Sequence, residues 1–266
     1  MKQRTITAVV AALIFLPIVI FGGLLFKLFI YLIASIAFLE LVRMKKISRY
    51  SVASGLGLLL VWALMFPVAD LEQYFDVSEL ITKSEITLLA VLVLLSYTVL
   101  VKNRFTFDDA GFLLISAIYI GMGFHYLIET RVQGGLEYLF FALFIVWATD
   151  TGAYLFGRAF GKHKLWPQIS PKKTIEGSIG GIVLACVVAF IFQWVAPLDH
   201  SLIIVLLVTV LISIAGQIGD LVESAFKRHY AVKDSGKILP GHGGVLDRFD
   251  SLIFILPILH LINFIA

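Results

Sequence analysis

The sequence has little charge and almost no cysteine. Only 15% of its 266 residues are charged, against roughly 25% in a typical soluble domain. Apolar runs recur along the whole length, which excludes a soluble fold that carries one membrane anchor. The single cysteine, Cys186, lies in one of these runs. It therefore excludes an intramolecular disulfide, and it argues against a cysteine-based metal site.

Two familiar catalytic signatures are also missing. The GxxxxGK[ST] spacing of a P-loop does not occur. His163, His229 and His242 lie in polar segments and could act as nucleophiles. However, no Ser/His/Asp order and no Cys/His pair accompanies them to support covalent catalysis.

The apolar runs predict an all-α polytopic membrane protein with about nine transmembrane helices. A span of about 20 apolar residues crosses the hydrocarbon core as a helix, because lipid offers the backbone no hydrogen-bond partners. We expect spans near 5–21, 24–42, 51–69, 86–101, 110–128, 137–156, 176–196, 202–219 and 251–266. They form a single integral membrane domain, 1–266, with a scaffold in 1–130 and the catalytic motifs in 140–250.

The basic residues predict how these spans are oriented. With a cytoplasmic N-terminus, 18 of the 21 Lys and Arg residues fall on cytoplasmic segments; only Lys27, Lys83 and Arg131 do not. This is the positive-inside pattern, and it places both large polar loops in the cytoplasm. The net charge of +3 therefore reflects membrane topology rather than nucleic-acid binding.

Polar residues inside or beside the spans concentrate after residue 140, and such residues indicate function by default. Asp150 looks the most buried of the carboxylates, and it could be a metal ligand, a proton-linked group or the partner of Arg158. Glu40, in the first half, is explained by snorkelling or by pairing with Arg43 or Lys45.

The segment GQIGDLVESAFKR, 216–228, continues a span into the cytoplasm. On a helix, Asp220, Glu223 or Ser224, and Lys227 share one face. This face could hold a metal ion and a phosphate. The alternative is a set of ordinary helix salt bridges, above all Glu223 with Lys227.

The segment PGHGGVLDRFD, 240–250, combines glycines with carboxylates. Its glycines allow a tight backbone and the close approach of a ligand, although an ordinary turn would also need them. Asp247 and Asp250 lie three residues apart at the start of the last span, where Asp247 could instead complement a helix N-terminus. Since Mg²⁺ takes few carboxylates plus substrate phosphate oxygens, we predict Asp220 and Asp247 as a pair of ligands.

The segment SPKKTIEG, 170–177, enters another span from the same side. Lys172, Lys173 and Thr174 near a helix N-terminus could receive a phosphate, or the lysines could be positive-inside anchors. Gly177 and Gly181 form a small-xxx-small pair that is typical of helix packing.

Taken together, these segments resemble the phosphatidate cytidylyltransferase (CDP-diacylglycerol synthase) family. The resemblance rests on SAFKR at 224–228, KDSG at 233–236, LPGHGG at 239–244 and DRFD at 247–250, with SPKKTIEG and ATDTGAYLFGR as further motifs. It is strong over roughly 140–250. It implies a multi-span enzyme that joins CTP and phosphatidate into CDP-diacylglycerol and releases pyrophosphate, with Mg²⁺. A CTP-dependent lipid-alcohol kinase and an anion transporter are the alternatives.

The resemblance also implies roles for residues. Catalysis would involve Asp220, Lys227, Arg228, Asp247 and Asp250, with Asp220 and Asp247 on the metal. Substrate binding would involve Lys172, Lys173, Thr174, Ser224, Lys233, Asp234, His242, Gly243, Gly244 and Arg248. The partners would be CTP, phosphatidate and membrane lipid in a bacterial cytoplasmic membrane, with the active site facing the cytoplasm. A homodimer and a second metal ion are left open.

Overall fold

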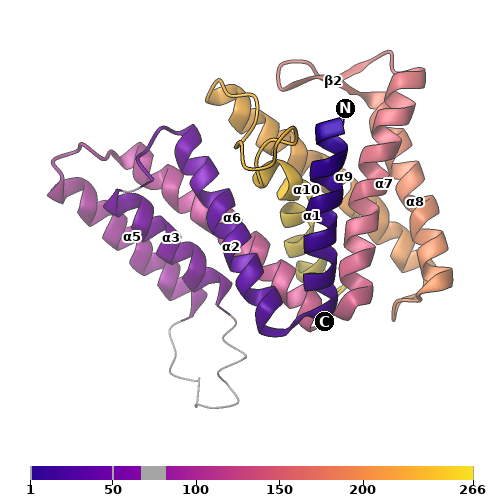
Figure 1. Ribbon diagram of the computed structural model, residues 1–266, viewed down its shortest axis with the longest axis horizontal. Helices are drawn as coiled ribbons and strands as arrows, with labels where there is room; N and C mark the ends of the chain where they lie inside the picture. Colours follow the sequence, from indigo (N-terminus) through magenta and orange to yellow (C-terminus); the bar gives the residue numbers. More distant parts are fainter. Residues whose placement is uncertain (1, 50, 67–81, 266) are drawn as a thin grey trace. The chain divides into compact units, whose positions relative to one another are not determined.

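The computed structural model describes residues 2–49, 51–66 and 82–265, and this part of the chain is almost entirely helical (Figure 1). Its helices are α1 (Lys2–Phe21), α2 (Gly23–Met44), α3 (Val52–Met65), α5 (Lys83–Leu100), α6 (Phe107–Val132), α7 (Gly135–Phe160), α8 (Ile175–Val195), α9 (Leu202–His229) and α10 (Leu246–Leu261). Each overlaps a predicted span, and residues 67–69 and 266 of those spans lie outside the described residues. The all-α fold class is confirmed.

Six of the described helices, α2, α5, α6, α7, α8 and α9, are long and apolar enough to cross a membrane. The apolar stretches of α1 and α3 are shorter, Val9–Phe21 and Val52–Met65. The prediction of an integral membrane protein is thereby confirmed. The cytoplasmic N-terminus and the single domain stay predictions.

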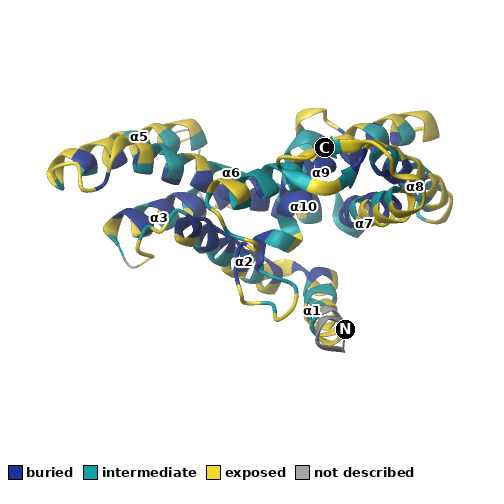
Figure 2. Ribbon diagram, turned by 90° about the horizontal axis from the view of Figure 1, so that it is seen from above, coloured by how far each residue is buried: buried dark blue, intermediate teal, exposed yellow. Residues whose placement is uncertain are grey.

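The chain divides into two compact units by its internal contacts. The first unit holds Met1–Glu129 and Ser235–Leu246, and large side chains such as Phe38, Leu64 and Phe124 fill its core. The Trp62 indole donates a hydrogen bond to the Ser35 hydroxyl at 2.9 Å and so ties α3 to α2. In contrast, α5 is mostly exposed (Figure 2), as expected of a helix that faces lipid.

The second unit holds Thr130–Asp234 and Asp247–Ala266. Its helices α7 and α8 pack closely because glycines remove side chains from their interface. A Cβ at Gly177 would lie 2.7 Å from the Ala153 carbonyl oxygen, and one at Gly181 would lie 2.7 Å from that of Thr149. The prediction that Gly177 and Gly181 serve helix packing is confirmed.

A short antiparallel hairpin connects α7 to α8 and lies at one end of both helices (Figure 1). It consists of β1 (Lys164–Trp166) and β2 (Ser170–Thr174). Glu176 fixes its base, because its carboxylate accepts from the backbone N–H groups of Lys162 and His163 and lies 2.6 Å from the His163 Nδ1. The sequence did not predict this hairpin, since its strands are only three and five residues long.

Candidate active site

A series of charged groups lies along the C-terminal end of α9 in the second unit. The Lys227 ammonium donates to the Glu223 carboxylate, one turn earlier on the same helix, and to the Asp247 Oδ1 of α10 at 2.7 Å. Glu223 is only 1% exposed. The predicted helix salt bridge therefore exists. It differs from an ordinary surface pair because its carboxylate is buried and its ammonium also pairs with Asp247 of a second helix.

Three carboxylates gather at this series. Asp220, Glu223 and Asp250 each offer an oxygen atom, and these atoms lie within 4.8 Å of one another. Like charges this close oppose one another's ionisation unless a cation is present. The Glu223 Oε1 is buried and has no hydrogen-bond partner among the described residues. Hard oxygen donors with one buried atom unused fit a divalent cation such as Mg²⁺.

The sequence explains how α10 comes close enough to contribute to this cluster. A Cβ at Gly219 of α9 would lie 2.7 Å from the Phe254 Cβ and 3.0 Å from the Asp250 carbonyl oxygen. The Ser251 hydroxyl donates to the Gly216 carbonyl oxygen at 3.0 Å. Glycines one turn apart on α9 thus let α10 pack against it and bring Asp250 to Asp220 and Glu223.

Beside Asp220 lies a cavity of about 420 Å³ in the same unit. The Lys173 ammonium, from β2, makes an ion pair of 2.5 Å with the Asp220 Oδ2 and so links the hairpin to α9. Lys172, Thr174 and Gln217 also line this cavity. The structure therefore brings the SPKKTIEG motif and Asp220 to one site, as both the phosphate hypothesis and the family resemblance require.

The structure corrects what the sequence suggested for Asp150. This side chain lines the cavity and is exposed, whereas Glu223 is far more deeply buried. The pairing of Asp150 with Arg158 finds no support, because the Arg158 guanidinium donates to the Tyr154 hydroxyl at 3.5 Å. The sequence pattern suggested burial because Asp150 lies in an apolar run, but the side chain lines the cavity.

Other predicted residues of this unit surround the cluster at varying distance. The Ser224 hydroxyl donates to the Asp220 Oδ1 at 3.4 Å, and the Arg228 Nε donates to the Ile169 carbonyl oxygen of the hairpin at 3.2 Å. Thr174 caps α8 by accepting from the Gly177 N–H at 3.1 Å. Three further predicted residues are exposed: Lys233, Asp234 and Arg248.

The glycine loop, residues 239–244, belongs to the first unit and forms a tight turn. Gly241 and Gly243 have φ angles of 79° and 86°, which residues with a side chain rarely adopt. The Leu239 N–H donates to the Gly243 carbonyl oxygen at 3.0 Å. These two glycines satisfy the turn interpretation. The His242 Nδ1 is buried without a hydrogen-bond partner among the described residues, so this ring has bonding capacity left for a ligand.

Glu40 holds this loop in place, a role that the sequence did not reveal. Its side chain is 5% exposed and accepts hydrogen bonds from the Ser235 hydroxyl at 3.0 Å and from the backbone N–H groups of Val245 at 3.0 Å and Leu246 at 2.9 Å. The snorkelling interpretation is wrong, because the carboxylate turns inward to buried donors. Any Cβ at Gly244 would collide with this carboxylate. The glycine therefore admits a protein carboxylate, and its role toward nucleotide stays a prediction.

Fold and site together define a polytopic membrane protein in which paired lysines lie beside a carboxylate cluster, a combination suited to binding phosphate groups. A family model described as the cytidylyltransferase family matches residues 2–266, and the chain belongs to this family. It is 56% identical over 263 residues to the phosphatidate cytidylyltransferase of Bacillus subtilis, covering 98% of this chain and 96% of that protein. Proteins of the same name from Staphylococcus epidermidis and Staphylococcus aureus are 52% and 49% identical, with 98% of each chain covered.

Proposed function

We propose that this protein transfers the cytidylyl group of CTP to phosphatidate. In this reaction a phosphate oxygen of phosphatidate attacks the α-phosphorus of CTP. A new P–O bond forms, the bond to the β-phosphate bridging oxygen breaks, and pyrophosphate leaves with that electron pair. The product is CDP-diacylglycerol. The attacking oxygen belongs to the substrate, so the protein needs no nucleophile of its own.

The observation that carries the proposal is the cavity in which Lys173 meets Asp220. An ammonium group at this position can exchange a carboxylate for a phosphate oxygen when substrate binds, and Lys172 stands on the same strand. Lys227 supplies another, half-buried cation between Glu223 and Asp247. Such fixed charges stabilise the charge that develops at the phosphates without reorganisation of water, and the cavity positions the reacting groups.

We propose that Mg²⁺ binds at the carboxylate cluster. Asp220 belongs both to the pair predicted with Asp247 and to the group formed with Glu223 and Asp250. Asp247 reaches this group through Lys227, which it shares with Glu223. When bound, the ion would neutralise charge on phosphate oxygens. The unpartnered Glu223 Oε1 supports a cation here.

We further propose that the site faces the cytoplasm from a bacterial cytoplasmic membrane. The positive-inside pattern, with 18 of 21 basic residues on one side, supports this orientation. CTP would then enter from the cytoplasm, and phosphatidate would enter sideways from the inner leaflet.

The test is product analysis with purified protein, labelled CTP, phosphatidate and Mg²⁺. We expect CDP-lipid and pyrophosphate in equal amounts, and neither when phosphatidate is omitted. A CTP-dependent lipid-alcohol kinase would release CDP, and an anion transporter would move solute without nucleotide turnover. Absence of CDP-lipid across a range of lipids and metal ions would contradict the proposal.

A further inference from the structure

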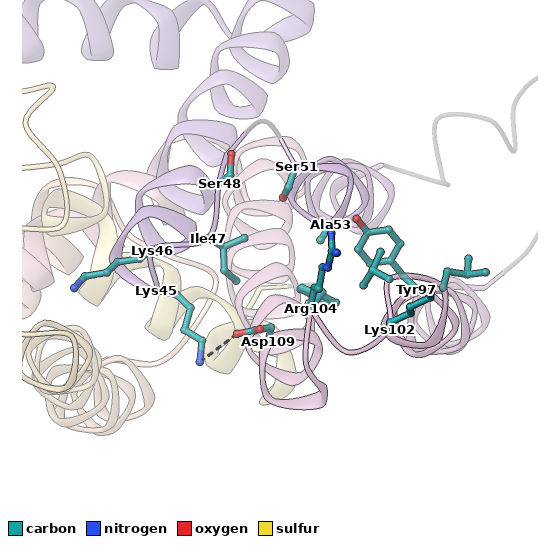
Figure 3. Close-up of a pocket in the computed structure, with 13 residues that line it drawn as sticks. Lys45, Lys46, Ile47, Ser48, Ser51, Ala53, Tyr97, Lys102, Arg104 and Asp109 are labelled. Atoms are coloured by element: carbon teal, nitrogen blue, oxygen red, sulfur yellow. Dashed lines mark ion pairs between the residues drawn. The ribbon is translucent and has the colours of Figure 1, made fainter.

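The first unit contains a cavity that the proposed reaction does not use. It measures about 780 Å³ and lies where α2, α3, α5 and α6 begin or end (Figure 3). Its lining carries four cations, Lys45, Lys46, Lys102 and Arg104, together with one carboxylate, Asp109. None of these residues belongs to the motifs described above. The positive-inside pattern accounts for the sign of their charge, but it does not account for a cavity that four of them line.

The residues that the structure describes compensate only part of the positive charge of this cavity. Asp109 is the only acidic residue of the lining, and its Oδ1 lies 3.4 Å from the Lys45 ammonium. Its Oδ2 accepts from the Thr106 N–H at 3.1 Å and from the Thr106 hydroxyl at 3.0 Å. Among the described residues none forms an ion pair with Lys46, Lys102 or Arg104. The cavity thus favours an anion.

Two of these cations occupy strained backbone positions. Lys46 follows α2 with a φ of 63°, and Lys102 follows α5 with a φ of 53°. Both helix ends have the same hydrogen-bond pattern: the Ile47 N–H donates to the Val42 carbonyl oxygen, and the Asn103 N–H donates to the Thr98 carbonyl oxygen. Glycine is the usual residue at this position, and another L-residue costs about 1 kcal/mol there. Strained residues that persist tend to mark functional sites.

The side chains suit a phosphate group in particular. In Figure 3 Arg104 extends toward Ala53 at the start of α3, while Lys45 turns to Asp109 and Lys46 extends outward. Ser51 and Tyr97 add hydroxyl groups to the lining. A guanidinium offers a planar fork of donors that matches phosphate oxygens, and hydroxyls can donate to the remaining ones.

The surroundings favour a phosphate that is attached to a lipid. The last residues of α5, Val99 and Leu100, are 76% and 78% exposed, and Lys102 and Arg104 follow Leu100 at the second and fourth positions. Leu100 also lines the cavity. An acyl chain could cover this apolar face while its head group enters the cavity, and basic pockets between transmembrane helices bind lipid head groups in this way. We infer that the cavity binds the phosphate head group of an anionic membrane phospholipid at Arg104 and Lys102.

The test measures binding of dioctanoyl phosphatidylglycerol to the full-length protein in detergent by native mass spectrometry. Dioctanoyl phosphatidylcholine serves as the zwitterionic comparison, and inorganic phosphate serves as competitor. Arg104→Gln should weaken phosphatidylglycerol binding by about tenfold, the worth of one charge-assisted hydrogen bond, and Arg104→Lys should weaken it less. The matched control is Arg43→Gln, since Arg43 is an exposed arginine at the end of α2 that does not line the cavity.

The outcomes separate the two sources of phosphate. The lipid site is supported if phosphatidylglycerol binding weakens in Arg104→Gln, weakens less in Arg104→Lys and is unchanged in Arg43→Gln. Phosphatidylcholine should then bind weakly, and inorganic phosphate should not compete at millimolar concentration. Competition by inorganic phosphate that also depends on Arg104 would overturn the lipid and identify a free-phosphate site. Equal binding by the wild type and all three variants would overturn the inference altogether. Thermal unfolding of each variant without lipid identifies any loss that reflects misfolding.

Discussion

Two buried glutamates, one in each unit, show two uses of the same side chain. Glu40 is 5% exposed and Glu223 is 1% exposed. Glu40 accepts from the Ser235 hydroxyl and from two backbone N–H groups. Glu223 receives Lys227 on one oxygen, while its other oxygen has no hydrogen-bond partner among the described residues. Burial alone therefore does not distinguish a structural carboxylate from a functional one.

The distinction lies in how the charge is satisfied. A buried carboxylate whose oxygens meet fixed donors is stable as it stands and holds the donors in place. A buried carboxylate with an unused oxygen beside two other carboxylates costs free energy until a cation arrives. We therefore assign Glu40 to positioning the glycine loop, and we include Glu223 in the proposed Mg²⁺ site. Each of the following predictions tests one side of this contrast.

The largest effect is expected for Asp247→Asn. The substitution removes the charge that Lys227 shares between α9 and α10. We expect turnover of CTP with phosphatidate to fall by about 10³-fold, at the upper end of what one preorganised electrostatic contact contributes. Membrane insertion and detergent-solubilised thermal unfolding should stay close to wild type. Near-normal turnover would remove Asp247 from the proposed site.

The next largest effect is expected for Glu223→Gln, which conserves shape but not charge. Turnover should fall by about 100-fold, and the Mg²⁺ concentration that gives half-maximal activity should rise. Thermal unfolding should be unchanged or shifted upward, because the variant no longer buries an incompletely satisfied charge. A stability loss without any change in Mg²⁺ dependence would make Glu223 a structural residue like Glu40.

Glu40→Ala should lower stability more than Glu223→Gln does, and it should leave the Mg²⁺ dependence unchanged. It leaves the N–H groups of Val245 and Leu246 and the Ser235 hydroxyl without their acceptor, and an unsatisfied buried donor costs about 1–3 kcal/mol. We expect a clear fall in thermal unfolding temperature and a moderate fall in turnover, with no change in Mg²⁺ dependence. Glu40→Gln retains one acceptor oxygen and should recover part of the stability. If Glu40→Ala changed the Mg²⁺ dependence instead, the contrast between the two glutamates would fail.

The sequence predicted the helices well because hydrophobic length is a strong local signal. Each predicted span overlaps a helix of the described residues, and the packing role of Gly177 and Gly181 followed from their spacing alone. The hairpin could not be predicted, because its pairing of Lys164 with Thr174 depends on contacts that no periodicity records. It nevertheless carries Lys173 to Asp220.

The site was predictable in composition but not in pairing. Helical spacing placed Asp220, Glu223 and Lys227 on one face, which the structure supports. It could not reveal that Asp250 joins the cluster while Asp247 lies on Lys227, since this depends on how α10 is rotated against α9. Glu40 was missed for a related reason: its donors lie about 200 positions away in the chain.

The smallest effect is expected for Ser235→Ala, which removes one of the donors to Glu40 and leaves the backbone donors of Val245 and Leu246 in place. One hydrogen bond to a charged group contributes about 1.5–3 kcal/mol. We expect the free energy of unfolding to fall by about 1.5 kcal/mol, the lower end of this range, and turnover to stay close to wild type. A double-mutant cycle with Glu40→Gln measures the coupling directly. Additive losses would mean that the 3.0 Å bond contributes nothing to holding the loop. Coupling of about 1 kcal/mol would show that Glu40 acts on the glycine loop through these donors, while Glu223 acts through the charge that it leaves unsatisfied.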